Sequence, residues 1–210
     1  TPLPPRDPEA DLDARLMALL HQKTRNMVRK GAKSGFDVGH ECSPETLKAL
    51  HSLHDENIRC IGGIPKAWNV FQAIMQVFSY DRDYRVYVAR NHDGQIVSGL
   101  LVFYFKDTVE YFIPATLAAY RSYQPLSFLI YSAMKDAILE RQARYWNWGG
   151  TWLSQNGVYA FKSKWGTQDF PYRYYIKEYL THGRMAICSR AELLNGYPYF
   201  YTIPFKELKP

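Results

Sequence analysis

Hydrophobic residues return along the first part of the chain at the spacing of amphipathic helices. One helix is predicted over residues 11–33, with apolar positions at Leu16, Leu20, Met27 and Val28. A second is expected to follow Ser43, a good capping residue, with Pro44 at its first position. A third is predicted to begin at Pro65 and to carry one apolar face. The first part of the chain is therefore expected to be mainly helical.

Alternating residues and turn signals mark the strands of an antiparallel sheet. Strands are predicted at residues 36–40, 84–88, 96–105 and 109–113. The dipeptide Asp93-Gly94 lies between two of them and is a strong hairpin signal. The middle of the chain is therefore predicted to form an antiparallel meander.

The remainder of the chain returns to a helix and then to short strands. An apolar helix is predicted over residues 125–141, and strands are predicted at residues 145–148 and 172–176. This order of elements predicts an α+β fold. One domain is expected over residues 11–210, behind a flexible, proline-rich leader at residues 1–10.

Composition excludes several classes of protein. Hydrophobic residues make up 47% of the 210 positions and charged residues 22%, so the chain is not globally disordered. Its cysteines, Cys42, Cys60 and Cys188, form no CxxC pair, and the histidines show no metal-ligand spacing, so no metal site is expected. No apolar run is long enough to span a membrane, and the opening residues lack the apolar segment of a signal peptide. A cytoplasmic location is therefore expected.

The net charge of +6 favours anionic partners. Phosphate-bearing small molecules, nucleotide-linked substrates and RNA all fit this charge. The charge alone does not choose among them, and the oligomeric state stays open.

Residues suited to chemistry concentrate after the predicted strand at residues 145–148. Residues 147–151 (NWGGT) contain paired glycines, which let a backbone approach a ligand closely. Residues 157–166 (GVYAFKSKWG) add lysines that could bind a phosphate or stabilise an oxyanion. The alternative is a plain loop with solvated lysines around a packed Trp165.

These two segments resemble the signature of the Fem-type peptidyltransferases, which belong to the GNAT acyltransferase superfamily. Residues 25–36 (RNMVRKGAKSGF) are similar to a second motif of that family, R-N-x-x-R-K-small-x-x-x-G-hydrophobic. The resemblance covers roughly residues 23–179 and corresponds to the second of two acetyltransferase-like domains in full-length members. It implies a GNAT-like fold, with a central, mostly antiparallel twisted sheet flanked by helices.

The resemblance also implies a function. Such proteins move an acyl or aminoacyl group from an activated carrier, either aminoacyl-tRNA or an acyl thioester, to an amine of a cell-envelope substrate such as a peptidoglycan precursor. The carrier is a co-substrate, and no tightly bound cofactor is expected. The alternatives are a non-catalytic, substrate-binding half of a larger transferase and, ranked last, an RNA-binding module.

Candidate catalytic residues follow from that chemistry. The family's Phe-Lys pair lies at the reaction centre, and it carries over onto Phe161 and Lys162. Lys162 could stabilise the oxyanion or contact a phosphate. A base could be Glu110, Asp81 or the substrate itself, although a strand carboxylate such as Glu110 is often simply exposed. The family more often has aspartate where Asn147 stands, which leaves a charged role there in doubt.

Candidate substrate contacts lie at Gly149 and Gly150 and in the loop that contains Tyr120, Arg121 and Tyr123. Residues 121–126 (RSYQPL) occupy the place of the (Q/R)-x-x-G-x-(G/A) loop that binds the pyrophosphate of acetyl-CoA, but contain no glycine. Plain acetyl-CoA is therefore disfavoured as the donor.

A basic stripe on the first predicted helix is a further candidate contact. Arg25, Arg29 and Lys33 are spaced four apart and share one helix face. They could contact the phosphates of a nucleotide-linked substrate or of tRNA. The alternative is an ordinary solvated helix face.

Overall fold

A computed structural model describes residues 1–7, 9–151 and 155–171, together with the single positions 175, 177, 179, 189, 191, 192 and 195. The chain divides into two compact units, Thr1–Gln168 and Asp169–Pro210, and the site belongs to the first. The strand predicted at residues 172–176 falls on positions that, apart from Tyr175, lie outside the described residues, as does Cys188. The single domain expected over residues 11–210 therefore stays a prediction.

The first unit is built on a five-stranded sheet with the order β1-β2-β3-β4-β5. The strands are β1 (Asp37–His40), β2 (Tyr84–Arg90), β3 (Ile96–Phe105), β4 (Thr108–Thr116) and β5 (Tyr145–Asn147). The pairs from β1 to β4 are antiparallel, whereas β5 runs parallel to β4. The predicted α+β fold with a mostly antiparallel sheet is thus confirmed.

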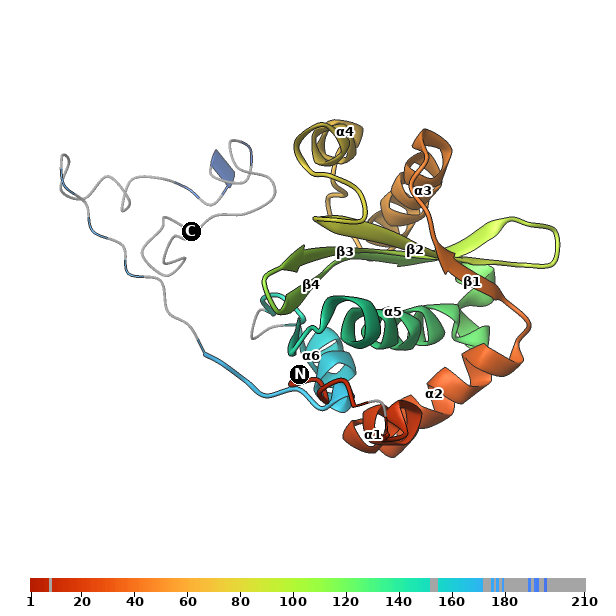
Figure 1. Ribbon diagram of the computed structural model, residues 1–210. Coiled ribbons are helices and arrows are strands. Elements are labelled where there is room, and N and C mark those ends of the chain that lie inside the picture. Colours follow the sequence, from red (N-terminus) through yellow and green to blue (C-terminus); the bar gives the residue numbers. More distant parts are fainter. Residues whose placement is uncertain are drawn as a thin grey trace. The chain divides into compact units, whose positions relative to one another are not determined.

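Helices cover both faces of this sheet (Figure 1). They are α1 (Leu12–Leu19), α2 (Gln22–Lys33), α3 (Pro44–Cys60), α4 (Trp68–Val77), α5 (Pro125–Arg141) and α6 (Asn156–Lys162), with short 3-10 turns η1 (Ala118–Tyr123) and η2 (Ser163–Trp165). α3 and α4 lie over one face, and α5, backed by α1 and α2, lies against the other.

Each face of the sheet has its own hydrophobic core. Leu100, Val102 and Val109 point toward α5, whereas Leu101 and Ile113 point toward α3 and α4. All five are fully buried. Burying such a side chain contributes about 1.5–3 kcal/mol, so both faces hold the sheet in one register.

The helix predicted over residues 11–33 is in fact two helices. The backbone is extended at Leu20, where α1 ends, and the Nδ1 atom of His21 caps α2 by accepting a hydrogen bond from the Lys23 N–H at 3.2 Å. Leu20 is 2% exposed. The break therefore lets Leu20 enter the core, which a continuous amphipathic pattern does not reveal.

Two further segments differ from what the sequence predicted for them. Residues 157–162 belong to α6 rather than to a loop, despite Gly157. Within the predicted leader, Leu3 is 7% exposed and donates its N–H to the Arg144 carbonyl at 2.8 Å, and Thr1 Oγ1 accepts a hydrogen bond from Trp148 Nε1. Thr1 and Leu3 therefore pack beside β5.

Candidate functional site

The parallel strands β4 and β5 pair only at their beginnings. The ladder runs from Thr108↔Tyr145 to Glu110↔Asn147. β4 then continues to Thr116, and no described strand pairs with that part of its edge. The last paired positions, Glu110 and Asn147, therefore lie where the two strands separate.

Strand alternation decides which way Glu110 points. Its neighbours Val109 and Tyr111 pack with the core on the α5 side. Glu110 is thus directed to the opposite face, toward α3 and α4, where its ladder partner Phe103 also packs. The side chain is half-buried rather than freely exposed. Burial raises the pKa of the Glu110 carboxyl, and the Lys162 ammonium and an Asn147 hydrogen bond oppose that rise.

The glycine pair forms the turn that follows β5. Gly149 has φ of +66°, a left-handed conformation that favours glycine, and its N–H donates to Asn147 Oδ1 at 3.1 Å. A Cβ at Gly149 would lie only 3.2 Å from Glu110 Oε1. The absent side chain therefore allows the backbone to lie directly beside the carboxylate.

Lys162 reaches this turn from the last residue of α6. Its Nζ donates hydrogen bonds to the Gly150 carbonyl at 3.2 Å and to Thr151 Oγ1 at 3.0 Å. Burial lowers the pKa of Lys162, and the nearby Glu110 carboxylate partly opposes this shift. Glu110, Lys162, Gly149 and Gly150, which were singled out from sequence, are thus brought together.

Phe161 has a different environment from its neighbour Lys162. Its ring packs against Trp148 and Trp165, with centroid separations of 6.1 and 6.0 Å. Trp165 is fully buried. Phe161 therefore anchors α6 to the core on the α5 side. It thereby fixes the backbone position from which the Lys162 side chain extends.

Sequence patterns did not identify Lys66, a second lysine on the Glu110 face. Its Nζ lies 5.3 Å from the centre of the Phe112 ring, a cation–π contact, and burial lowers its pKa. No ion pair within the described part of the chain involves Lys66. A half-buried cation without a carboxylate is costly unless a ligand pairs with it.

The remaining candidate contacts gather at the other end of β4. Tyr120 accepts a hydrogen bond from Asn91 Nδ2 at 2.9 Å, whereas Arg121 and Tyr123 are exposed. These residues follow the end of β4, about 20 Å along the strand from Glu110 at roughly 3.3 Å per residue. They form a second group, separate from Lys162 and Glu110.

α2 packs closely on this second group. A Cβ at Gly31 would lie 2.5 Å from the Gln124 carbonyl oxygen, so the small residue of the motif is required for this contact. Arg29, two positions before Gly31, is exposed. Arg25 is half-buried and donates a hydrogen bond to the Leu20 carbonyl at 2.8 Å. Of the two arginines, Arg29 is the freer to meet a ligand.

The start of α5 offers few free amides. Gln124 has φ of +64°, and its N–H donates to the Arg121 carbonyl at 3.2 Å. Pro125, the first residue of the helix, has no N–H, and Ser127 Oγ donates to Gln124 Oε1. Gln124 thus adopts a left-handed backbone conformation that glycine favours, and its N–H is already bonded.

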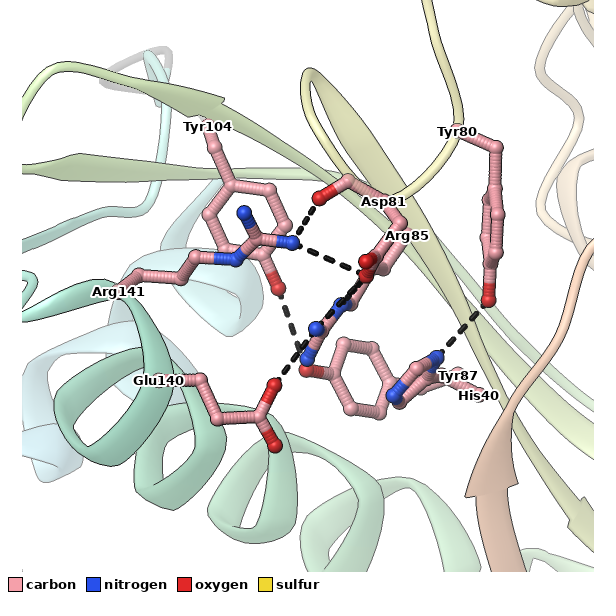
Figure 2. Close-up of polar contacts among 8 residues, drawn as sticks. All are labelled: His40, Tyr80, Asp81, Arg85, Tyr87, Tyr104, Glu140 and Arg141. Carbon is pink, nitrogen blue, oxygen red and sulfur yellow. Dashed lines mark hydrogen bonds and ion pairs between the residues drawn. The ribbon is translucent and has the colours of Figure 1, made fainter.

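Asp81, the other candidate base, lies in a separate charged cluster (Figure 2). Its Oδ1 pairs with Arg85 Nη2 at 2.7 Å and with Arg141 Nη2 at 2.9 Å. Arg85 also pairs with Glu140 at 2.6 Å, and its side chain is only 5% exposed. Arg85 lies opposite Val102 on the α5 face of the sheet. Asp81 therefore serves an ion-pair network and lies away from Glu110.

No group of three or more histidine, cysteine or acidic side chains within the described residues is placed to hold a metal ion. No helix of that same part is long and apolar enough to cross a membrane.

Comparisons with known proteins agree with this architecture. A family model described as an acetyltransferase (GNAT) domain matches residues 22–163. A search of curated proteins finds no significant match. The match to a crystal structure of FemX has 18% identity and a TM-score of 0.70, and covers 80% of this chain and 57% of that one. The chain thus spans less than two thirds of FemX.

Complete acetyltransferase structures also match the fold. The aminoglycoside 6'-N-acetyltransferase AAC(6')-Ih from Acinetobacter baumannii has 15% identity and a TM-score of 0.52, with 70% of this chain and all of that chain covered. AAC(6')-Iy, in complex with a CoA-containing bisubstrate analogue, has 14% identity and a TM-score of 0.50, with 70% and 99% covered. The expected GNAT-like fold is confirmed, whereas the likeness to FemX at this identity shows the fold alone.

Proposed function

Because this chain belongs to the family of GNAT acetyltransferase domains, we propose that it transfers an acyl group to an amine at Glu110 and Lys162. One observation carries the proposal. A desolvated carboxylate from β4 and a desolvated ammonium from α6 meet at the glycine turn where β4 and β5 separate. A carboxyl group with a raised pKa close to an ammonium group with a lowered pKa is typical of acid–base sites.

The reaction assigns a role to each group. The amine nitrogen attacks the carbonyl carbon of the activated acyl group, and a new N–C bond forms. Glu110, as general base, takes the proton that the amine loses. Lys162 stabilises the negative charge that develops on the carbonyl oxygen. The bond from the carbonyl carbon to the carrier oxygen or sulfur then breaks, and the carrier leaves with a proton.

The raised pKa of Glu110 suits this role, because a general base works best when its pKa lies near the working pH. The partial burial that lowers the pKa of Lys162 also strengthens the attraction between its ammonium and a developing negative charge. Asn147 keeps the carboxylate beside the glycine turn. An aspartate at this position would instead repel Glu110.

The donor carrier is proposed to bind at the second group, around the start of α5. Exposed Arg29 and Arg121 supply positive charge there. The N–H of Gln124 is already bonded and Pro125 has none, which disfavours the amide cradle that acetyl-CoA uses. We therefore propose aminoacyl-tRNA, or an acyl thioester held by side chains, as the donor.

The acceptor is proposed to be an amine of a cell-envelope substrate, such as a peptidoglycan precursor, and the reaction to take place in the cytoplasm. Lys66, which forms no ion pair within the described residues, offers a contact for an anionic group of that substrate. A specific observation also favours a second function. The chain spans 57% of the FemX length, so it could serve as a substrate-binding half of a larger transferase.

A transfer assay separates the two functions. The protein is incubated with radiolabelled aminoacyl-tRNAs or acyl-CoAs and with amines that include a lysine-bearing peptidoglycan precursor. We expect label transfer from at least one donor, and a loss of about a hundredfold in turnover for Lys162→Ala. Lys48→Ala, which removes an exposed lysine of α3, is the matched control. Unchanged precursor affinity with no transfer from either donor class would support the binding half instead.

A further inference from the structure

Three phenylalanines form a continuous row on the sheet face that carries Glu110. The ring centroids of Phe78 and Phe103 lie 5.0 Å apart, and those of Phe103 and Phe112 lie 5.1 Å apart. Such separations are typical of aromatic rings in direct contact. The three side chains, called here the phenylalanine row, cross from the end of α4 over β3 to β4.

The phenylalanine row leads from solvent to the proposed base. Phe78 is 41% exposed at its outer end. Phe103 lies directly opposite Glu110 in the ladder, which places their Cβ atoms about 5 Å apart. An amine that approaches Glu110 along this face therefore passes over the row.

A bulge in β4 brings Phe112 into the row. Leu101 pairs with Ile113 and Val102 pairs with Tyr111, so Phe112 is an extra residue with no partner opposite. A bulge redirects side chains, and here Phe112 and Ile113 both pack on the α3 and α4 face. The bulge thus adds an apolar side chain to the face of β4 that carries Glu110.

The phenylalanine rings themselves offer apolar contact and no hydrogen bonds, and the Lys66 ammonium lies over the Phe112 end of the row, away from Phe78. Phenylalanine side chains have no polar atom, and Phe105, which follows on the same face of β3, is 72% exposed. Exposed apolar patches beside a polar site commonly mark ligand contacts. A sugar or nucleotide ring would need polar partners at its edge, whereas a hydrocarbon group needs none.

We propose that the phenylalanine row binds an apolar group next to the reacting nitrogen, so that the acceptor is a primary amine on an alkyl or arylalkyl chain. This inference rests on the proposed function in one respect, because it takes Glu110 as the base that meets the amine. The hydrocarbon chain lies along Phe103 and Phe78, and the nitrogen lies at Glu110.

The test measures binding separately from turnover. Affinities of ethylamine, propylamine, butylamine, pentylamine and hexylamine are measured by NMR titration, with 2-(2-aminoethoxy)ethanol as a polar amine of similar length. In the unaltered protein we expect each added CH2 to raise affinity about two- to fourfold, since a fully buried CH2 contributes about 0.8 kcal/mol. The polar amine should bind no better than ethylamine.

Variants connect the chain-length dependence to the row. Phe78→Ser and Phe103→Ser should reduce the gain per CH2 to less than about 1.5-fold. Leu139→Ser is the matched control, because Leu139 is also 41% exposed but belongs to α5 on the other face. Phe105→Ser removes an exposed side chain with little risk to folding and should lower the affinity of the longest amines only. Melting temperatures report whether each variant is folded.

The outcomes distinguish this inference from the proposed function. If affinity rises with amine chain length in the unaltered protein but not in Phe78→Ser, the phenylalanine row binds the hydrocarbon chain. This conclusion holds even if no donor gives transfer, and then only the proposed function is contradicted. Affinity that is independent of chain length, or a gain that persists in folded Phe78→Ser and Phe103→Ser, overturns the row. If short and long amines are then acylated equally well, the proposed function stands without it.

Discussion

Two charged clusters lie at different places on the same sheet, one on its α5 face and one at the edge where β4 and β5 separate, and their charges are paired differently. On the α5 face, buried Arg85 pairs with Asp81 and with Glu140, and Asp81 also binds Arg141. At the β4–β5 edge, the hydrogen bonds of Lys162 go to the glycine turn, and Glu110 receives one from Asn147. Both clusters are partly buried, but only the first forms a network of short ion pairs.

The contrast separates structural charges from functional ones. The network around Arg85 compensates desolvation with ion pairs, and the pKa of Asp81 is held below its usual value by its Arg85 hydrogen bond. At the other cluster burial prevails, which raises the pKa of Glu110 and lowers that of Lys162. Incomplete pairing leaves these two groups able to exchange a proton or meet a ligand, and four experiments test that difference.

The largest expected effect is on turnover in Glu110→Gln. Loss of the base should lower kcat about a thousandfold, because general-base catalysis contributes roughly 10²- to 10⁴-fold. The free energy of unfolding at neutral pH should stay equal or rise slightly, since a desolvated carboxylate is removed. Kinetics with the donor found by the transfer assay, together with urea unfolding, measure both. If Glu110→Gln were strongly destabilised but kept a normal kcat, Glu110 would have a structural role and would not be the base.

The second experiment breaks the ion-pair network. The double variant Asp81→Asn, Glu140→Gln should lose about 3 kcal/mol of unfolding free energy, because it leaves the buried Arg85 cation unpaired. Arg85→Met should cost less, since the freed carboxylates are 54% and 47% exposed and can be hydrated. Urea unfolding gives both values. Equal losses in the two proteins would contradict the assigned role of the buried cation.

A smaller loss is expected for Lys162→Ala. Removing one oxyanion donor should lower kcat about a hundredfold, with little change in KM. Lys162→Arg keeps the charge but changes its geometry, so it should recover only part of the rate. Steady-state kinetics of the three proteins provide the measurement. A change confined to KM would assign Lys162 to binding.

The pH dependence of the rate should show the smallest effect. Glu110 must be ionised, so the rate should rise with pH through a pKa above the 4.5 of a free glutamate. Lys162 must be charged, so the rate should fall at a pKa below 10.5. Because its folded pKa is raised, Glu110 lowers stability as pH rises through that range. A profile of kcat/KM checks both limbs, and Lys162→Arg should move only the alkaline one.

Local signals predicted much of the fold. Ser43 caps α3 as expected, since its Oγ accepts a hydrogen bond from the Thr46 N–H at 3.0 Å. The Asp93-Gly94 signal lies at the turn between β2 and β3, and Gly94 has φ of +76°. α6 was missed, because a helix with Gly157 depends on packing of Phe161 and Trp165 rather than on its own propensity.

The site was predicted only as separate residues. Glu110 and Lys162 lie on elements far apart in the sequence, and only the parallel pairing of β4 with β5 brings them together. The sequence left Asp81 and Glu110 as alternative bases, because the turn before β2 that holds Asp81 and the register that directs Glu110 are both decided by the folded sheet. No sequence pattern pointed to Lys66, because its interest comes from its burial and from the lack of an ion pair among the residues that the structure describes.

The extra residue in β4 has a consequence for how this strand can change over evolutionary time. Glu110 and Ile113 are three positions apart and would face opposite sides of a regular strand, yet both face α3 and α4 because Phe112 interrupts the alternation. Deleting Phe112 would leave Glu110 and Ile113 two positions apart, so a regular strand would still place both on that face and only the extra phenylalanine would be lost. Homologues that lack the extra residue should therefore keep the acid on this face but lose the apolar ring beside it.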